Sequence, residues 1–315
     1  MARAGWAINS RTNKRRLEIP TLSIAAVIYG GYFLLTWFFR DLPLLLSAAL
    51  GGLLIAWYGS FQHETIHGHP TRSRRINTML AGLPLSLWMP YEVYRDIHLR
   101  HHRHGGRYLT HPTHDTESYY LVPGAYAAAG MCRRWVYSAQ RTLAGRLIVG
   151  PPLALLALWS QECRKLRAGN RRHLLIWLRH TLGVTIVLTW VVSICRVPLW
   201  VYLGLMVYPS MSLTQLRSFV EHRAHIAPAL RTAVVETNPF WAMLFLNNNL
   251  HIAHHAWPNL AWYELPRAWR QMRTSPSGLR ANGSGLVFEG GYLQVARRYF
   301  FRPVITAEHP MLGIE

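Results

Sequence analysis

Charged side chains are scarce in this sequence. They make up 15% of the 315 residues, whereas an ordinary soluble domain has roughly 25%. Acidic side chains are especially few, at 14 against 34 lysines and arginines, and half of all residues are hydrophobic. This composition argues against a water-soluble domain, and it predicts that a membrane-embedded part and a polar part share the chain.

Cysteine is equally scarce. The three cysteines are an odd number, and they lie far apart at Cys132, Cys163 and Cys195. This count and spacing argue against a disulfide framework and against a CxxC metal site. We therefore expect three free thiols.

Long stretches lack charge altogether. Residues 19–39 and residues 42–62 contain no charged side chain, and each run has about the 20 residues that a membrane-spanning helix needs. Arg40 and Asp41 between them predict a tight hairpin. Glycines at 30, 31, 51 and 52 would let these two helices approach each other closely.

A second hairpin is predicted around Arg196, Val197 and Pro198. The predicted spans are about 20–39, 42–62, 176–195 and 198–216. The apolar stretches 77–95 and 149–160 contain prolines, so we expect them to lie at the membrane interface. Turns are expected at 275–278 and 282–283.

The basic residues predict how the chain lies in the membrane. They cluster in residues 3–16, 71–75 and 164–172, whereas the hairpin tips carry only Arg40 and Arg196. The positive-inside rule places both termini and a large cap, residues 63–172 and 217–315, in the cytoplasm. The net charge of +20 then fits anionic membrane lipid as a partner rather than nucleic acid. We predict one all-α integral membrane domain over 1–315, with four transmembrane helices in two hairpins and a cytoplasmic helical cap.

Histidine is the residue that stands out. There are seventeen histidines, and twelve of them fall in four clusters, which begin at His63, His98, His222 and His251. Side chains at positions i, i+3 and i+4 lie on one face of a helix. This spacing brings together His63 with His67, His98 with His101 and His102, and His251 with His254 and His255, and His222 adds a ninth imidazole.

Neutral imidazole is a common ligand for iron, copper, zinc and nickel. Nine imidazoles are too many for one metal ion, and they suit two ions that keep positions open for oxygen or water. Without a metal, so many buried imidazoles would leave polar nitrogens unsatisfied. Isolated histidines are more often hydrogen-bonding residues, and we expect this of His69, His104, His111, His114, His173, His180, His225 and His309.

The pattern HxxxH, HxxHH and HxxHH, with the first box closing a transmembrane hairpin, resembles the membrane fatty acid desaturase superfamily. That superfamily also holds alkane and lipid hydroxylases and carotenoid ketolases. The resemblance covers roughly residues 20–270, and residues 247–258 followed by 262–266 are similar to bacterial members. It implies two iron ions, dioxygen as cosubstrate, and either removal of two hydrogens from a hydrocarbon chain or its hydroxylation.

The resemblance also assigns the residues. His63 and His67 match the first box, His98, His101 and His102 the second, and His251, His254 and His255 the third, while His222 matches an extra histidine found between boxes in such proteins. Asn247 matches an asparagine that holds a metal-bound water, with Asn248 an equal rival by spacing. Glu64, Asp96, Asp115 and Glu221 are candidates to accept an imidazole N–H.

Electrons are expected from outside the chain. His309-Pro310-Met-Leu is not the HPGG signature of a fused haem domain, so we expect an external ferredoxin, rubredoxin or cytochrome b5-like donor. The bacterial inner membrane is the expected location, with the active site on the cytoplasmic side.

Other functions remain as alternatives. His63-Glu64-Thr-Ile-His67 is also the HExxH pattern of zinc proteases, with Glu64 as the base, but a protease would leave the other boxes unused. A metal transporter or haem protein would need polar residues inside the spans. Among the oxidative reactions we favour desaturation over hydroxylation or ketolation. An acyl lipid is the default substrate, and a bacterial secondary metabolite is the alternative.

Overall fold

The computed structural model describes residues 17–103, 107–274 and 286–310. His104, the basic residues 3–16 and the turns expected at 275–278 and 282–283 lie outside this range. The described chain divides into two compact units. The span unit comprises Leu17–Asp96 and Gly150–Gln215, and the histidine unit comprises the described parts of Ile97–Val149 and Leu216–Glu315.

All the regular secondary structure described in the span unit is helical. Its helices are α1 (Ile19–Trp37), η1 (Phe39–Asp41), α2 (Leu44–Ile66), α3 (Arg74–Ala81), α8 (Arg171–Leu188), η3 (Thr189–Ile194), α9 (Leu199–Val201) and η4 (Tyr202–Val207). Three further helices cross the unit boundary, and these are α4 (Tyr91–His101), α7 (Leu143–Arg167) and α10 (Tyr208–Ser218).

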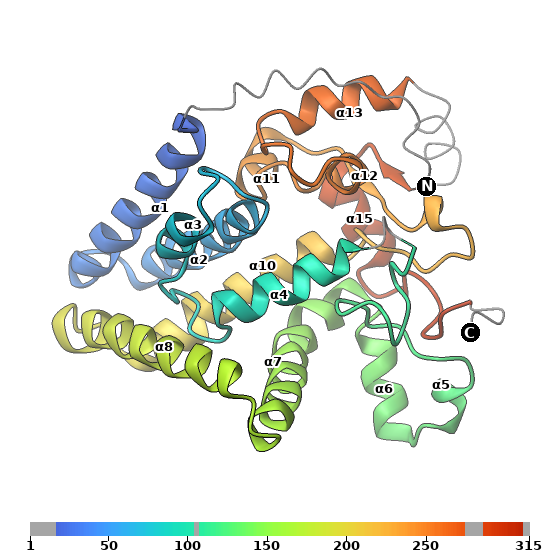
Figure 1. The fold of residues 1–315 in the computed structure, drawn as a ribbon, viewed down its shortest axis with the longest axis horizontal. Coiled ribbons are helices and arrows are strands. Elements are labelled where there is room, and N and C mark those ends of the chain that lie inside the picture. Colours follow the sequence, from blue (N-terminus) through green and yellow to red (C-terminus); the bar gives the residue numbers. More distant parts are fainter. Residues whose placement is uncertain (1–16, 104–106, 275–285, 311–315) are drawn as a thin grey trace. The chain divides into compact units, whose positions relative to one another are not determined.

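Helix α1 packs against α2 (Figure 1). The η4 segment also packs against α2. Polar links connect these helices. The hydroxyls of Tyr32 and Tyr202 lie 2.8 Å apart, and the indole of Trp190 donates to the Thr36 hydroxyl over 2.9 Å. Links of this kind favour helix association where the surroundings are apolar.

The outward faces of these helices are apolar. Leu34 is 61% exposed, Leu45 80% and Leu182 63%. Water would solvate such a surface poorly, whereas lipid chains match it. The exposed leucines therefore indicate contact with hydrocarbon.

Within the described residues, four helices are long and apolar enough to cross a membrane, namely Ile19–Trp37, Leu44–Ile66, Leu143–Arg167 and Arg171–Ile194. The mostly helical class and the presence of four candidate spans are confirmed. The hairpin pairing and the cytoplasmic side of the cap stay predictions.

Two span predictions need correction. The stretch 149–160, expected to be short, belongs to the 25-residue helix α7, which continues through Pro151 and Pro152. The predicted span 198–216 is helical, but the π-helical η4 divides it into α9, η4 and α10. It is therefore not one of the four long helices, whereas α7 is.

The glycines also act differently from expectation. A Cβ on Gly31 would meet Leu54 at 3.2 Å, which fits a close approach of α1 and α2. Gly51 and Gly52 instead face η4 and α10, where a Cβ would meet Met206 at 2.7 Å and Pro209 at 3.4 Å. A Cβ on Gly30 would meet no atom of the described residues within 4 Å. Two of the four glycines therefore serve the contact with η4 and α10.

A matched pair of substitutions tests this contact. Gly51→Ala should destabilise the protein by about 1–3 kcal/mol, because the new methyl group overpacks a buried site. Gly30→Ala should cost nothing, because its methyl group meets no described neighbour and alanine is the better helix former. Thermal unfolding of both variants in detergent measures the difference, and equal melting temperatures would contradict the packing described.

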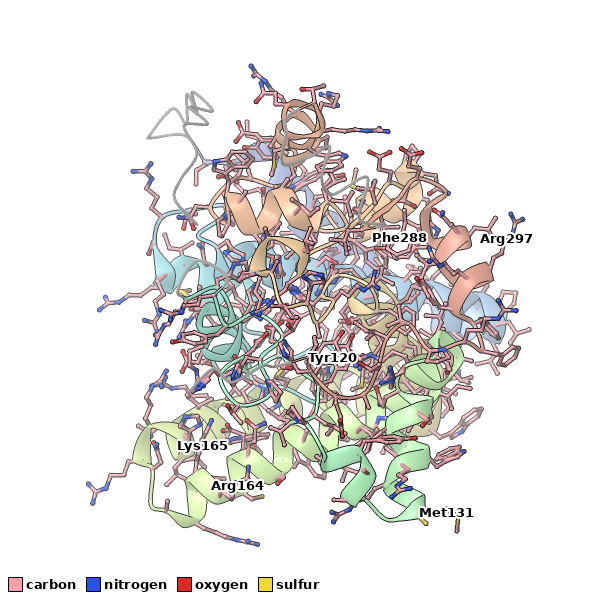
Figure 2. All side chains as sticks on the ribbon, turned by 90° about the vertical axis from the view of Figure 1, so that its right-hand side faces the viewer. Tyr120, Met131, Arg164, Lys165, Phe288 and Arg297 are labelled. Carbon is pink, nitrogen blue, oxygen red and sulfur yellow. The ribbon has the colours of Figure 1, made fainter. Side chains whose placement is uncertain are left out.

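The histidine unit is also mostly helical. Its own elements are α5 (Ala125–Ala128), α6 (Met131–Ala139), η5 (Pro228–Leu230), β1 (Val234–Val235), α11 (Pro239–Leu244), α12 (His251–Ala256), α13 (Leu265–Arg273), β2 (Val287–Phe288) and α15 (Gly291–Tyr299). The two short strands pair in parallel, with Val234 opposite Val287. Figure 2 shows Met131 and Arg297 at the periphery and Tyr120 among other side chains, in agreement with their exposure.

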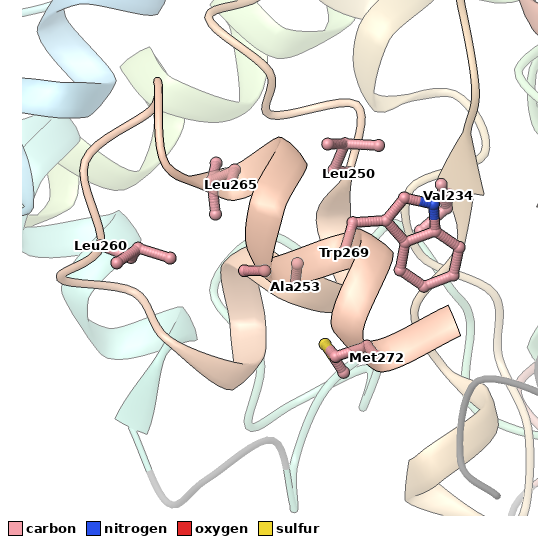
Figure 3. Close-up of a cluster of buried hydrophobic side chains, with 8 residues drawn as sticks. Val234, Leu250, Ala253, Leu260, Leu265, Trp269 and Met272 are labelled. Atoms are coloured by element: carbon pink, nitrogen blue, oxygen red, sulfur yellow. The ribbon is translucent and has the colours of Figure 1, made fainter. Parts of the chain in front are cut away.

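A hydrophobic cluster holds α12 in place. Ala253, on α12, is fully buried against α13, where Leu265 and Trp269 pack around it (Figure 3). Because Ala253 lies two residues after His251 and one before His254, the histidines project from the other side of the helix. The helix ends before Trp257, because the next residue is Pro258 and a proline disfavours the α conformation of the residue that precedes it.

Candidate metal centre

Seven of the nine predicted histidines lie in the histidine unit. His98 and His101 occupy the last turn of α4, and His102 directly follows it. His222 comes shortly after α10, and the remaining three are on α12. Three stretches that are far apart in sequence therefore bring their imidazoles together.

Four of these imidazoles form a compact group, which we call the quartet: His101, His222, His251 and His255. Their ligand nitrogens all lie within 4.8 Å of one another. The Nε2 atoms of His101 and His222 are 3.0 Å apart, those of His222 and His251 are 3.0 Å apart, and those of His251 and His255 are 3.1 Å apart.

The other ring nitrogens show which tautomers are present. Nδ1 of His101 lies 2.7 Å from Asp115 Oδ1, Nδ1 of His222 lies 3.4 Å from the Arg231 carbonyl oxygen, and Nδ1 of His251 lies 3.2 Å from the Asn248 carbonyl oxygen. Carboxylate and carbonyl oxygens can only accept, so each Nδ1 carries a proton and donates it. Each neutral ring is left with an unprotonated Nε2.

When neutral, His101, His222 and His251 therefore direct Nε2 lone pairs toward one another. Two lone pairs at about 3 Å make no hydrogen bond with each other, and one added proton would satisfy only one of the three close contacts. A cation among them would attract all four nitrogens. Two ligands at right angles on a metal with metal–nitrogen bonds of about 2.1 Å are separated by about 3.0 Å. The spacing in the quartet therefore fits a bound transition metal.

A second group in the same unit, the trio, consists of His98, His102 and His254. Nε2 of His102 lies 3.1 Å from Nε2 of His98 and 3.1 Å from Nε2 of His254. Nδ1 of His98 donates to the Glu117 carboxylate over 2.8 Å, so its Nε2 also offers a lone pair. The rings of His102 and His255 stack with their centroids 4.3 Å apart, which connects the trio to the quartet.

His63 and His67 belong to the span unit. They lie at the end of α2, because this helix continues to Ile66 rather than ending near residue 62. Their ring centroids are 4.9 Å apart, as their i, i+4 spacing predicts. Both side chains are buried.

Burial keeps most of these imidazoles neutral. It lowers the pKa of His222 to about 3, with a further contribution from His101. It likewise places the pKa values of His98, His251 and His255 well below the usual range. Burial also acts to lower the pKa of His101, but Glu117 and Asp115 outweigh it and raise that pKa to about 8. Neutral imidazole is the form that binds metal.

The predicted carboxylate partners differ in their positions. Asp115 is buried and holds His101. Glu221 is buried, lies 3.7 Å from His251 Nδ1, and has a pKa that burial raises to about 7. Asp96 pairs with Arg172 in the span unit. Glu64 is buried in the last turn of α2, where its carbonyl oxygen accepts from the His67 backbone N–H over 3.1 Å.

The structure distinguishes the two asparagines. The Asn247 side chain donates to the Trp262 carbonyl oxygen over 3.0 Å. The Asn248 side chain lies 3.2 Å from His251 Nδ1 and donates to Glu221 over 3.4 Å. Helix α12 begins at His251 and does not include the asparagines, because Leu246 and Asn247 have positive φ angles of 46° and 56°, which a right-handed helix excludes.

The sequence did not predict three of the hydrogen-bond acceptors that orient the histidine rings. Glu117 holds His98, and the main-chain carbonyls of Arg231 and Asn248 hold His222 and His251. Glu117 lies 19 residues after His98, so no helical spacing marks it. A backbone carbonyl has no sequence signature at all.

Comparison with known proteins agrees with the geometry. The family model described as Fatty acid desaturase matches residues 41–279, well over half of the chain. This range contains all nine predicted histidines. No curated protein matches the chain. The resemblance stated from the histidine boxes is confirmed, and the chain belongs to the fatty acid desaturase family, a family of oxidoreductases.

Proposed function

We propose that this membrane protein is a dioxygen-dependent di-iron desaturase that introduces a double bond into the hydrocarbon chain of an acyl lipid. The observation that supports this proposal most strongly is the quartet, whose Nε2 atoms converge at 3.0–3.1 Å. An all-imidazole donor set without thiolates suits iron in its divalent state. Family membership favours iron over the other metals that imidazole binds.

The quartet would hold one iron. His98, His102 and His254 would serve the second iron, and we assign His63 and His67 to it from the family pattern. Bound irons would supply the activation of dioxygen that attack on an unactivated C–H bond requires. The chain contributes acceptors for the Nδ1–H groups of His98, His101, His222 and His251, so that Nε2 of these rings can face the metal.

The electron balance requires a partner. Reduction of dioxygen to two waters takes four electrons, and conversion of a CH2–CH2 unit to an alkene supplies only two of them. The other two would come from a ferredoxin, rubredoxin or cytochrome b5-like donor. The net charge of +20 would attract an acidic donor to the protein. We place the site on the cytoplasmic side of a bacterial inner membrane.

Metal content and product analysis test the proposal together. The protein purified from membranes should contain two irons per chain. With a reductant and a donor, an acyl chain deuterated at adjacent carbons should lose two deuterium atoms in a reaction that depends on dioxygen. Mass spectrometry of the lipid and elemental analysis of the protein measure both results.

Other outcomes would reject the proposal in different ways. Gain of one oxygen with loss of a single deuterium would show that the protein is a hydroxylase of the same superfamily. One zinc per chain and no dioxygen consumption would favour the HExxH protease. A matched preparation in which His222 and His251 are both replaced by alanine shows how much metal binds elsewhere.

A further inference from the structure

The chain beyond the family match contributes to the histidine unit. The family model ends at residue 279, yet residues 307–309 bind residue 121 through main-chain hydrogen bonds. The Leu121 N–H donates to the Ala307 carbonyl oxygen and the His309 N–H to the Leu121 carbonyl oxygen, both over 2.9 Å. These two bonds fix the backbone on both sides of Glu308, which forms a parallel bridge with Leu121.

This placement directs the His309 side chain inward. His309 is only 2% exposed, and its Nε2 lies 3.0 Å from the Thr110 hydroxyl oxygen. That hydroxyl donates its own proton to the Leu109 carbonyl oxygen. His309 Nε2–H is therefore the donor to Thr110. The other nitrogen, Nδ1, has no hydrogen-bond partner within the described residues.

Thr110 is held in an unusual backbone conformation. Its φ angle is 66°, and the residue is 1% exposed. A β-branched residue rarely adopts a positive φ, so surrounding bonds must maintain it. His309 holds the hydroxyl, and Ser118 donates to the Thr110 carbonyl oxygen over 2.8 Å.

The same conformation directs the Thr110 N–H at Asp115. This N–H donates to Asp115 Oδ2 over 2.7 Å. The other oxygen, Oδ1, accepts from His101 Nδ1 over 2.7 Å and from the Glu117 N–H over 2.9 Å. A continuous chain of bonds thus runs from His309 through Thr110 and Asp115 to a histidine of the quartet.

We infer that His309 is a positioning residue for the metal held by the quartet. By fixing Thr110, it fixes the Asp115 carboxylate that orients the His101 ring. The inference rests on the proposed function, since it concerns one of the two metals proposed there. It assigns a role to a histidine that spacing alone marks as ordinary.

The test compares His309→Ala with His309→Gln. The amide nitrogen of glutamine reaches the position of Nε2 and can donate to Thr110, whereas alanine cannot. Each purified full-length protein is loaded with ferrous iron without oxygen and then mixed with a chelator that is coloured when it binds ferrous iron. His309→Ala should release one of its two irons about tenfold faster than the parent protein. This is the lower end of the loss of metal affinity, about 10- to 100-fold, that follows when a residue supporting a ligand is removed.

Controls separate positioning from general damage. His114→Ala, an exposed histidine on the same loop, should behave as the parent protein does. Thr110→Val should reproduce His309→Ala, and the double variant should be no worse than either single one. His309→Gln should restore slow release.

Three results would overturn the inference. They are unchanged release from His309→Ala, equal acceleration of both irons, and failure of His309→Gln to restore the parent rate. A parent protein that binds no iron would instead reject the proposed function, and the inference with it.

Discussion

The His222→Ala variant is expected to bind one iron instead of two and to desaturate its substrate at least about 100-fold more slowly. Loss of a residue that only supports a metal ligand costs up to about 100-fold, and loss of the ligand itself should cost at least as much. His222 Nε2 lies 3.0 Å from Nε2 of both His101 and His251, so this ring is central to the quartet. Its removal leaves a gap that three rings on two other segments cannot fill. Elemental analysis and the rate of double-bond formation measure the two effects.

His225→Ala is the matched control. It removes the same side chain three residues later, where Nδ1 accepts from the Ala227 N–H over 2.9 Å. Iron content and rate should both stay near those of the parent protein. If the two variants lost activity equally while each kept two irons, the quartet would not be a metal site.

Arg231→Met is expected to destabilise the protein by about 3–5 kcal/mol, because it leaves several buried acceptors unsatisfied and each of them costs about 1–3 kcal/mol. Arg231 is 2% exposed. Its guanidinium donates to the carbonyl oxygens of His225, Ile226, Arg107 and Leu109 at 2.6–3.2 Å. Methionine fills a similar volume but would leave all four buried oxygens without this donor.

The expected fall in melting temperature is on the order of 10 °C. Thermal unfolding in detergent measures it, and Arg223→Met is the control, because Arg223 is exposed and its loss should shift the melting temperature little. Iron should also bind more weakly to Arg231→Met, because the carbonyl oxygen of residue 231 accepts from His222 Nδ1. An unchanged melting temperature would show that the guanidinium is not holding these loops together.

The sequence predicted the site best where the signal was helical spacing. Histidines at i, i+3 and i+4 share one face of a helix whatever surrounds it, and those on α4 and α12 do gather in the quartet and trio. The uncharged runs likewise predicted α1 and α2 closely, since a membrane requires about 20 apolar residues to cross it.

Predictions were weaker where the surroundings override a local rule. Proline normally ends a helix in water, yet α7 passes through Pro151 and Pro152; neighbouring groups can compensate for the lost bond in an apolar setting. Spacing could not separate Asn247 from Asn248. The two positive φ angles that turn Asn247 toward Trp262 depend on tertiary packing.

The main-chain acceptors have a consequence for how this centre tolerates mutation. Two quartet rings, His222 and His251, donate their Nδ1 protons to carbonyl oxygens of the backbone, and every amino acid carries such an oxygen. A codon change at residue 231 or 248 can shift this acceptor but cannot delete it. A substitution there acts on the ring only by displacing the backbone, as expected for Arg231→Met, whereas a single missense change at Asp115 removes the acceptor of His101 itself.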